Sequence, residues 1–368
     1  MSHRYVRRLL PVLGGLTALV ATPASASATL PTLPAQVFGT NCVPASTATL
    51  TEVPWAQRTL RPERVWPLAT GAGVTVAVLD SGVTGGGQLA GTVRRAGADC
   101  AGHGTFVASL VAARPADGTG LVGLAPNATI LNVPTTAGTA AAAIRAALAR
   151  HADVICLSTV ASQAGGKLDA AVAAANAAGV PIVTPAYGES GNPLPASVLG
   201  GHDGVITVGG VGPDGKDATT PPAAARIDVY APGKAVTGLG PRGGQYVAAG
   251  AGIATGFVAA TVALVRQYRP DLTPAAIRRR LATTGYQQNT VTPAGTVDPL
   301  AAVTAATGGQ ADAARSPARR VSMPAPPAGP GGRTTALAVL GGAAGVVAAA
   351  TGIGAVLRRG RRRRWRPA

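Results

Sequence analysis

The sequence predicts an α/β domain built on a mainly parallel β-sheet, with helices covering both of its faces. Between residues 65 and 307, short runs rich in Val, Ile and Leu alternate with longer Ala-rich segments. Strands of a parallel sheet are buried on both faces, so they read as nearly continuous apolar runs. The segments between them are long enough to be crossover helices. With 368 residues, 47% of them apolar, the chain can form one large core with appended segments.

Individual elements follow from hydrophobic periodicity. Five apolar runs are the predicted strands, at 74–80, 128–134, 154–158, 181–186 and 205–211. Five amphipathic or apolar segments are the predicted helices, at 103–113, 140–150, 168–178, 252–268 and 274–283. Functional groups of such sheets lie at the carboxyl ends of the strands. Polar residues that follow these runs are therefore the candidates for function.

The N-terminal residues 1–28 are typical of a secretory signal peptide. Three arginines precede the apolar run LLPVLGGLTALVA, and Ala26 and Ala28 each end a small-x-small cleavage site. An uncleaved membrane anchor is the alternative, and with either the following chain is exported. Residues 29–64 contain five prolines and little periodicity. They predict an extended arm that needs a surface to become ordered.

The C-terminal part predicts a membrane anchor. Residues 308–334 are rich in Ala, Pro, Gly and Arg and indicate a flexible linker. Residues 335–357 are uncharged and mostly apolar, and a helix of that length can cross a hydrocarbon core of about 30 Å. The Arg-rich tail at 358–368 follows at once, and the positive-inside rule places it in the cytoplasm. We therefore expect a single-pass protein of the cell membrane, with its folded domain outside the cytoplasm.

The net charge of +17 is concentrated at the two ends of the chain. Ten arginines lie in the N-terminal segment and the C-terminal tail, whereas residues 29–307 hold 18 basic and 14 acidic side chains. Nucleic-acid binding needs a dense basic surface on the folded domain. The distribution therefore favours a topology signal at the membrane and argues against a nucleic-acid partner.

The three cysteines are Cys42, Cys100 and Cys156. A disulfide is plausible in an exported protein. Cys156 lies inside an apolar strand and is expected to be a buried thiol, which leaves Cys42 and Cys100 as the pair. A free reactive thiol is the alternative.

Asp80 and His103 are the candidate catalytic residues. Asp80 ends the predicted strand 74–80, and His103 opens a predicted helix between two glycines. A carboxylate there can fix the tautomer of a histidine, which then passes a proton between a nucleophile and a leaving group. The alternative is a buried hydrogen-bonded pair, in which the loss of one partner would leave the other unsatisfied. Two such side chains alone would bind a metal weakly, and we expect neither a metal nor a cofactor.

The order Asp, His and then a later nucleophile is that of subtilisin. VAVLDSGV and GHGTFVA resemble the aspartate and histidine motifs of the subtilases, and FVAATVALVRQYRPDLTPAAIRRRL resembles their serine helix and the helix after it. PWAQRTLRPERVWPL, ADCAGHGT and PASVLGGHDGVITVGGVGPDG resemble the mycosins, the membrane-anchored subtilases of type VII secretion systems. The resemblance covers residues 54–305 in matching order. It implies a subtilisin-like fold, serine endopeptidase activity on a peptide or protein, partners in the type VII membrane complex and a disulfide near the arm.

The chain departs from the family at the catalytic centre. The family's serine motif reads roughly GTSxAAP, but residues 250–256 read GAGIATG, so Gly252 stands at the nucleophile position. Thr255 lies nearly one helical turn onward and would project elsewhere. Gly188, or alternatively Tyr187, stands where the family places its oxyanion asparagine, and Ser158-Thr159-Val160 replaces an SLGG-like segment.

These departures predict a pseudoprotease that acts as a scaffold or peptide-binding component. The alternative is an active serine-type endopeptidase that uses Asp80, His103 and an unidentified nucleophile. A third hypothesis, a basic nucleic-acid or envelope-polymer binder, is disfavoured because the charge lies in the terminal segments.

Overall fold

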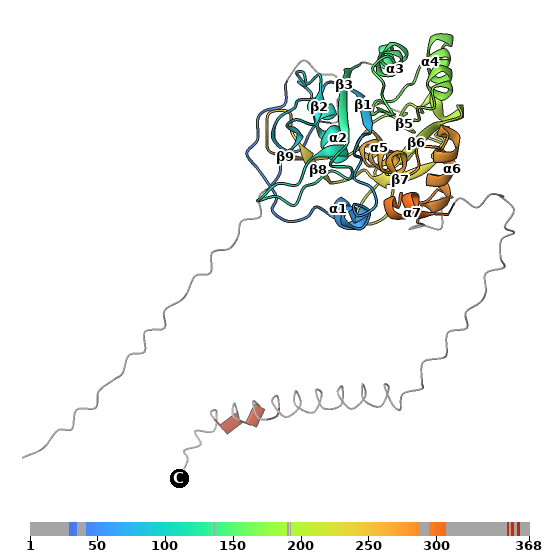
Figure 1. Ribbon diagram of the computed structural model, residues 1–368. Coiled ribbons are helices and arrows are strands. Elements are labelled where there is room, and N and C mark those ends of the chain that lie inside the picture. Colours follow the sequence, from blue (N-terminus) through green and yellow to red (C-terminus); the bar gives the residue numbers. More distant parts are fainter. Residues whose placement is uncertain are drawn as a thin grey trace, which may run out of the picture. The chain divides into compact units, whose positions relative to one another are not determined.

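The computed structural model describes residues 29–34, 42–135, 137–189, 191, 193–286, 294–306, 352, 355–356 and 359–360. The chain forms two compact units, Met1–Ala306 and Thr307–Ala368. All the elements named below belong to the first unit, whose centre is a seven-stranded parallel sheet in the order β2-β3-β1-β4-β5-β6-β7 (Figure 1).

The five predicted strands are all present in this sheet, and four further strands were not predicted. The sheet strands are β1 Thr75–Asp80, β2 Val93–Arg94, β3 Thr129–Pro134, β4 Val154–Leu157, β5 Ile182–Pro185, β6 Val205–Val211 and β7 Val229–Pro232. An antiparallel pair is formed by β8 Val236–Leu239 and β9 Gln245–Ala248. The unpredicted strands span only two to four residues. The predicted strands β4 and β5 are no longer than β7, but they lie within the longer apolar runs 154–158 and 181–186, which made them recognisable.

The five predicted helices are also confirmed. The α-helices are α1 Trp55–Leu60, α2 His103–Ala112, α3 Ala140–Leu148, α4 Gly166–Ala177, α5 Ala251–Tyr268, α6 Pro274–Thr284 and α7 Pro299–Thr304. Short 3₁₀ turns lie at Pro62–Arg64, Gly87–Leu89, Ala137–Thr139 and Val198–Gly201. The short helices α1 and α7 were not predicted, and α1 lies within the segment predicted to be an extended arm.

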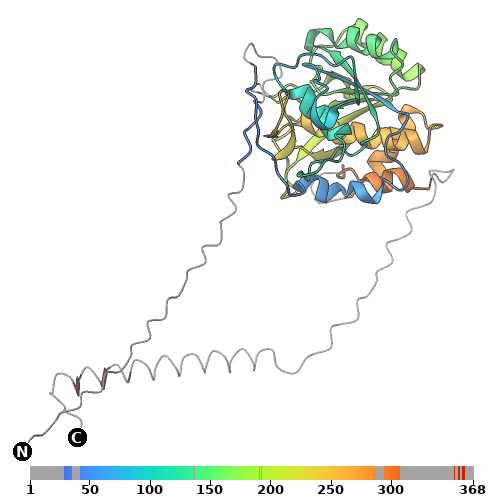
Figure 2. The same cartoon turned by 60° about the vertical axis from the view of Figure 1, so that its left-hand side comes forward.

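Helices pack on both faces of the sheet, as the sequence predicts (Figures 1 and 2). Along β1, Val76 and Val78 belong to the hydrophobic cluster of α2 and α5, whereas Ala77 and Leu79 belong to that of α3 and α4. Residues 251–265 of α5 are all buried. A helix that is apolar all round is typical of a protein interior, so α5 forms the centre of the core beside α2.

The carboxyl ends of the central strands bring the functional segments together. In the parallel register, Leu79 of β1 lies opposite Leu157 of β4, so Asp80 and Ser158 follow at the same edge of the sheet. Helix α2 begins at His103 and α5 at Ala251. Both helices contact β1 and each other, so Asp80, His103 and Gly252 can meet although 172 residues of sequence separate the first from the last.

The described part of the predicted arm lies along the β8–β9 hairpin and the loop before α2. Leu33 N–H donates to Val247 O at 2.8 Å, and Val43 N–H donates to Cys100 O at 2.8 Å. Gln245 N–H donates to Ala48 O at 2.8 Å. These backbone bonds are what order a segment that has no hydrophobic periodicity of its own.

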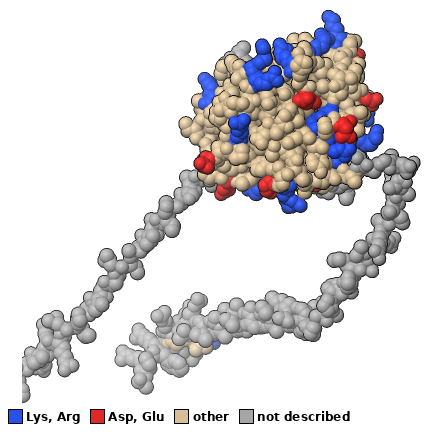
Figure 3. Space-filling view, in the orientation of Figure 1, with Lys and Arg blue, Asp and Glu red and all other residues tan. Residues whose placement is uncertain are grey.

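The predicted signal peptide at 1–28 and linker at 308–334 lie outside the described residues, as do nearly all of the predicted membrane span at 335–357 and the basic tail. Among the helices that the structure describes, none has the length and hydropathy needed to cross a membrane. On the face of the folded unit that Figure 3 shows, Lys and Arg side chains are interspersed with Asp and Glu.

Candidate active site

Asp80 and His103 form a buried pair at the carboxyl edge of the sheet. His103 Nδ1–H donates to Asp80 Oδ2 at 2.7 Å, and the two side chains are 1% and 0% exposed. The strand end of β1 places the carboxylate, and the first residue of α2 places the imidazole. This is the arrangement that orients a histidine for proton transfer through its other nitrogen.

Two further donors hold the Asp80 carboxylate. Ser81 N–H donates to Oδ1 at 2.6 Å, and the Ser158 hydroxyl donates to Oδ2. Burial opposes ionisation of Asp80, but the charge of His103 and these hydrogen bonds outweigh it and hold the pKa below its usual value. Asp80 is therefore ionised at neutral pH.

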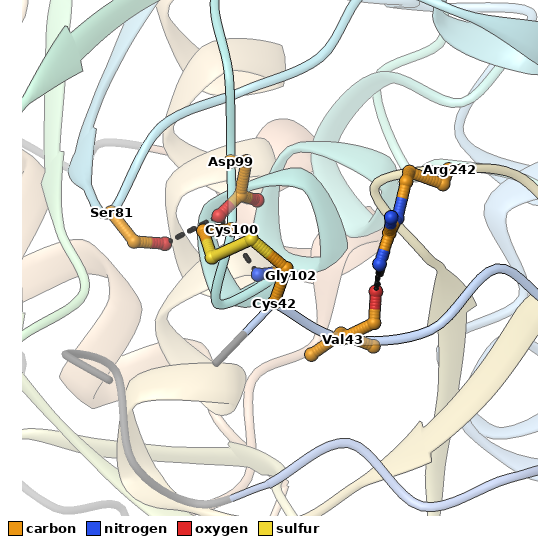
Figure 4. Close-up of a disulfide and its surroundings, with 7 residues drawn as sticks. All are labelled: Cys42, Val43, Ser81, Asp99, Cys100, Gly102 and Arg242. Atoms are coloured by element: carbon orange, nitrogen blue, oxygen red, sulfur yellow. Dashed lines mark hydrogen bonds between the residues drawn. A yellow bond between two sulfur atoms is a disulfide. The ribbon is translucent and has the colours of Figure 1, made fainter. Parts of the chain in front are cut away.

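Asp99 holds the start of α2. Its Oδ1 accepts Gly102 N–H and the Ser81 hydroxyl, each at 2.8 Å (Figure 4). Its Oδ2 accepts Thr105 N–H at 2.8 Å. An anion at this end also complements the helix dipole. Asp99 was not predicted as a site residue, because it lies three residues before the N-cap Gly102 and outside the usual capping position.

The predicted disulfide between Cys42 and Cys100 is present, and Cys156 is a free, buried thiol. The disulfide joins the arm to the residue beside Asp99, and Arg242 donates to Val43 O next to it (Figure 4). The arm is therefore tied to the loop that places His103.

Gly252 occupies the position that faces the histidine. A Cβ built on Gly252 would lie 3.4 Å from His103 Cε1, so the helix register is that of a nucleophile. That Cβ would also lie 2.7 Å from Glu189 Oε1 and would overlap the carbonyl oxygen of Ser158. Thr255 turns its hydroxyl back to the carbonyl of Gly252, away from the imidazole. The space for a nucleophile is thus filled by neighbouring groups.

Glu189 enters the centre from the loop after β5. Its Oε1 accepts Gly252 N–H at 2.9 Å and lies 3.8 Å from His103 Nε2, and the side chain is 10% exposed. Within the described residues, neither Glu189 Oε2 nor His103 Nε2 has a hydrogen-bond partner. Glu189 was not among the predicted site residues, although an acidic residue three positions after a predicted strand end was the available signal.

Gly188 lies beside Glu189 and offers no side chain. Its N–H donates to Pro195 O at 2.8 Å, and a Cβ there would lie 2.8 Å from Pro195 Cγ. The loop therefore has no room for an asparagine at Gly188, and the adjacent carboxylate takes the backbone N–H of Gly252 instead.

The two carboxylates set the charge of His103. Burial alone would lower the pKa of the imidazole, but the charge and hydrogen bond of Asp80, followed by Glu189, raise the pKa well above its usual value. A protonated imidazole cannot accept a proton from a nucleophile or from water. Both carboxylates therefore favour the protonated form of His103. No group of three or more potential metal-ligating side chains occurs in the described part of the chain.

Comparison with known proteins gives the family. Residues 71–295, which include Asp80, His103 and Gly252, match the Peptidase_S8 family, described as the subtilase family. The chain is 31% identical to mycosin-1 of Mycobacterium tuberculosis, with 98% of this chain and 100% of the relative covered.

Solved structures of mycosins have a fold similar to that of this chain. The crystal structure of MycP1 from Mycobacterium smegmatis has a TM-score of 0.61 and 26% identity, and covers 75% of this chain and 89% of that chain. The structure of the MycP3 protease from the type VII (ESX-3) secretion system has a TM-score of 0.55 and 26% identity, and covers 75% and 98%. The fold, the Asp80–His103 pair and these matches together show that the chain belongs to the subtilase family, as a mycosin-like member with a degenerate serine motif.

Proposed function

We propose that this chain is a catalytically impaired, membrane-anchored subtilase that acts as a scaffold or peptide-binding component of a type VII secretion system. The observation that carries the proposal is Gly252, which has no side chain at the position facing His103. The link to secretion is supported by relatives whose structures are described as parts of type VII systems. The membrane anchor is supported by the apolar segment at 335–357 and the basic tail after it.

The size of the defect supports loss of catalysis. In subtilisin, loss of the serine nucleophile lowers turnover by about 10⁶-fold, and loss of the asparagine oxyanion donor lowers it by about 10²–10³-fold. Here both positions are glycine. The first loss alone corresponds to about 8 kcal/mol of transition-state stabilisation.

The surroundings of Gly252 strengthen this argument. Glu189 accepts the Gly252 N–H, the backbone donor that a developing oxyanion would need. A negative oxygen placed beside that carboxylate would be repelled. The raised pKa of His103 also reduces the fraction of neutral imidazole that could act as a general base.

A fluorophosphonate probe tests the proposal directly. We expect no labelling of the purified full-length chain and no cleavage of a peptide library, under conditions in which mycosin-1 serves as the positive control. Labelling that disappears in a His103→Ala variant would refute the proposal. That result would favour the alternative, an endopeptidase that uses Asp80, His103 and an unidentified nucleophile.

A genetic experiment tests the scaffold role. Deleting the chain should reduce assembly of the secretion complex in its host, and expression of the His103→Ala variant should restore it. Restoration only by the unaltered chain would imply chemistry at the site. Equal assembly without the protein would refute the scaffold role.

Anchoring is tested by cell fractionation. The full-length chain should sediment with membranes, and a chain ending at residue 307 should be released into the extracytoplasmic soluble fraction. Membrane association of the shortened chain would contradict the predicted span.

A further inference from the structure

We propose that the centre formed by Gly250, Gly252 and His103 is a binding site for a carboxylate, and that the Glu189 side chain is its internal ligand. The inference deepens the proposed function, because it assumes that the centre binds rather than cleaves. The external ligand is a monocarboxylate, either the C-terminal carboxylate of a peptide or a small carboxylic acid.

The donors at the centre are those of an anion site. Gly252 N–H is one of the free N–H groups at the start of α5, an 18-residue helix whose dipole favours negative charge there. His103 presents Nε2 to the centre, and the Asp80 carboxylate behind it favours the protonated, positively charged imidazole. A cation would be disfavoured by the Gly252 N–H and by protonated His103, so a metal is a poor candidate.

Two glycines make space for the carboxylate. A Cβ on Gly252 would lie 2.7 Å from Glu189 Oε1, and a Cβ on Gly250 would overlap the same oxygen. Gly250 also has a φ of 150°, which side-chain-bearing residues rarely adopt. The space that holds Glu189 Oε1, called the cradle below, therefore exists because Gly250 and Gly252 have no side chains.

Glu189 fills this cradle incompletely. Its Oε1 is 3.8 Å from His103 Nε2, which is longer than a hydrogen bond. Within the described residues, both Nε2 of the buried His103 and Oε2 of Glu189 have no hydrogen-bond partner. Such unsatisfied groups are costly. A carboxylate that is not tethered to the chain could lie about 1 Å closer to His103 Nε2 than Glu189 does. It could then accept hydrogen bonds from Gly252 N–H and His103 Nε2–H together.

The Glu189 carboxylate is weakly held in the centre. Within the described residues, its one hydrogen bond is the one it accepts from Gly252 N–H. The tethered side chain competes with any external ligand at high effective concentration, so binding is easiest to observe when Glu189 is removed.

The test uses the purified full-length Glu189→Ala variant, titrated with sodium acetate against sodium chloride at equal ionic strength. The readout is the His103 imidazole NMR signal, assigned by its loss in His103→Ala. Four heavy atoms limit the affinity, so we expect a saturable shift with a Kd on the order of millimolar. Acetate should also raise the pKa of His103 in the variant, and acetamide, which has the same shape but no charge, should do neither.

Matched variants separate the site from general salt effects. Glu189→Gln keeps the shape and the acceptor for Gly252 N–H, so its cradle stays filled and acetate should bind at least tenfold more weakly than to Glu189→Ala. Glu63→Ala, which removes an exposed carboxylate elsewhere, should behave as the unaltered chain. If Glu189→Ala does not fold, Glu189→Ser is titrated in its place.

Peptides identify the source of the carboxylate. A pentapeptide with a free C terminus that binds at least tenfold more tightly than acetate, while its amidated form does not bind, would assign the site to peptide C termini. Equal binding of acetate and the free-acid peptide would assign it to small carboxylic acids.

The proposal would be overturned if acetate caused no saturable shift of the His103 NMR signal in Glu189→Ala or Glu189→Ser. It would also be overturned if Glu189→Gln showed the same shift. These outcomes are independent of the fluorophosphonate result. Labelling would refute the proposed function, whereas a failed titration would refute only the carboxylate site.

Discussion

Gly252→Ser is the substitution that would return a nucleophile to this family position, and we expect it to destabilise the chain without restoring hydrolysis. The new Cβ would lie 2.7 Å from Glu189 Oε1 and would overlap the Ser158 carbonyl oxygen. The glutamate side chain can move, but the carbonyl belongs to the backbone that follows β4. The strain therefore falls on the carboxyl edge of the sheet.

The expected change in the free energy of unfolding of Gly252→Ser follows from two opposing effects. Replacing a helical glycine by serine gains about 0.5 kcal/mol of helix propensity. Overpacking a dense core costs about 1–3 kcal/mol. The net loss is about 0.5–2.5 kcal/mol, which for a domain of this size lowers Tm by roughly 1–10 °C.

Thermal unfolding of the full-length chain measures this loss, and Gly252→Ala should show a similar one because the clash comes from the Cβ. Gly166→Ser is the matched control. Gly166 lies in the first turn of α4, is exposed, and a Cβ there meets nothing within 4 Å. Its Tm should stay the same or rise slightly.

Activity of Gly252→Ser is measured with a peptide substrate. We expect turnover at least ~10²-fold below that of an active relative, because the oxyanion asparagine is absent and Glu189 occupies the Gly252 N–H. A variant that unfolds at the wild-type Tm and cleaves peptide readily would refute both the packing argument and the assignment of Glu189.

Three further predictions concern the groups around His103. The folded pKa of His103, which faces Asp80 and Glu189, is raised above its reference value of 6.5. Its contribution to stability is therefore present below about pH 6.5 and lost as the pH rises through the folded pKa. The folded pKa of Asp80 is depressed below 3.8, so its contribution is present above about pH 3.8 and lost as the pH falls through the folded pKa. Tm measured against pH should show both losses, and His103→Gln should remove the alkaline one. The disulfide closes a sequence separation of 58 residues, so Cys42→Ser with Cys100→Ser should lower the free energy of unfolding in urea by up to about 4 kcal/mol. Asp99→Ala removes the acceptor of two N–H groups at the start of α2, so it should cost about 1–2 kcal/mol in the same assay.

Each of these predictions has an outcome that would contradict it. The Tm advantage of the wild type over His103→Gln should shrink as the pH rises above 6.5. If this Tm difference stays constant, the pKa of His103 is not raised. Unchanged urea midpoints in the double serine variant would show that the arm adds no stability through the disulfide. For Asp99→Ala, Asp117→Ala is the control, because Asp117 is exposed, and equal effects would argue against a specific role at the helix start.

Much of the fold could be predicted from local patterns. The five predicted strands and the five longest helices appear as apolar runs or helical periodicity, because burial imposes these patterns along consecutive residues. The strands β2, β7, β8 and β9 and the helices α1 and α7 were missed, because two to six residues contain fewer than two helical turns or only one to two strand repeats.

The sequence by itself determined that this protein has a subtilase-like α/β domain, an Asp–His pair and a glycine in place of the nucleophile, because each of these depends on the identity of a residue within a short motif. Only the tertiary structure decided what fills the vacant position. Glu189 meets Gly252 from 63 residues away, and Ser158 meets Asp80 from 78 residues away. Those contacts depend on how the strand ends converge at one edge of the sheet, which is a property of the packed chain and not of any local segment.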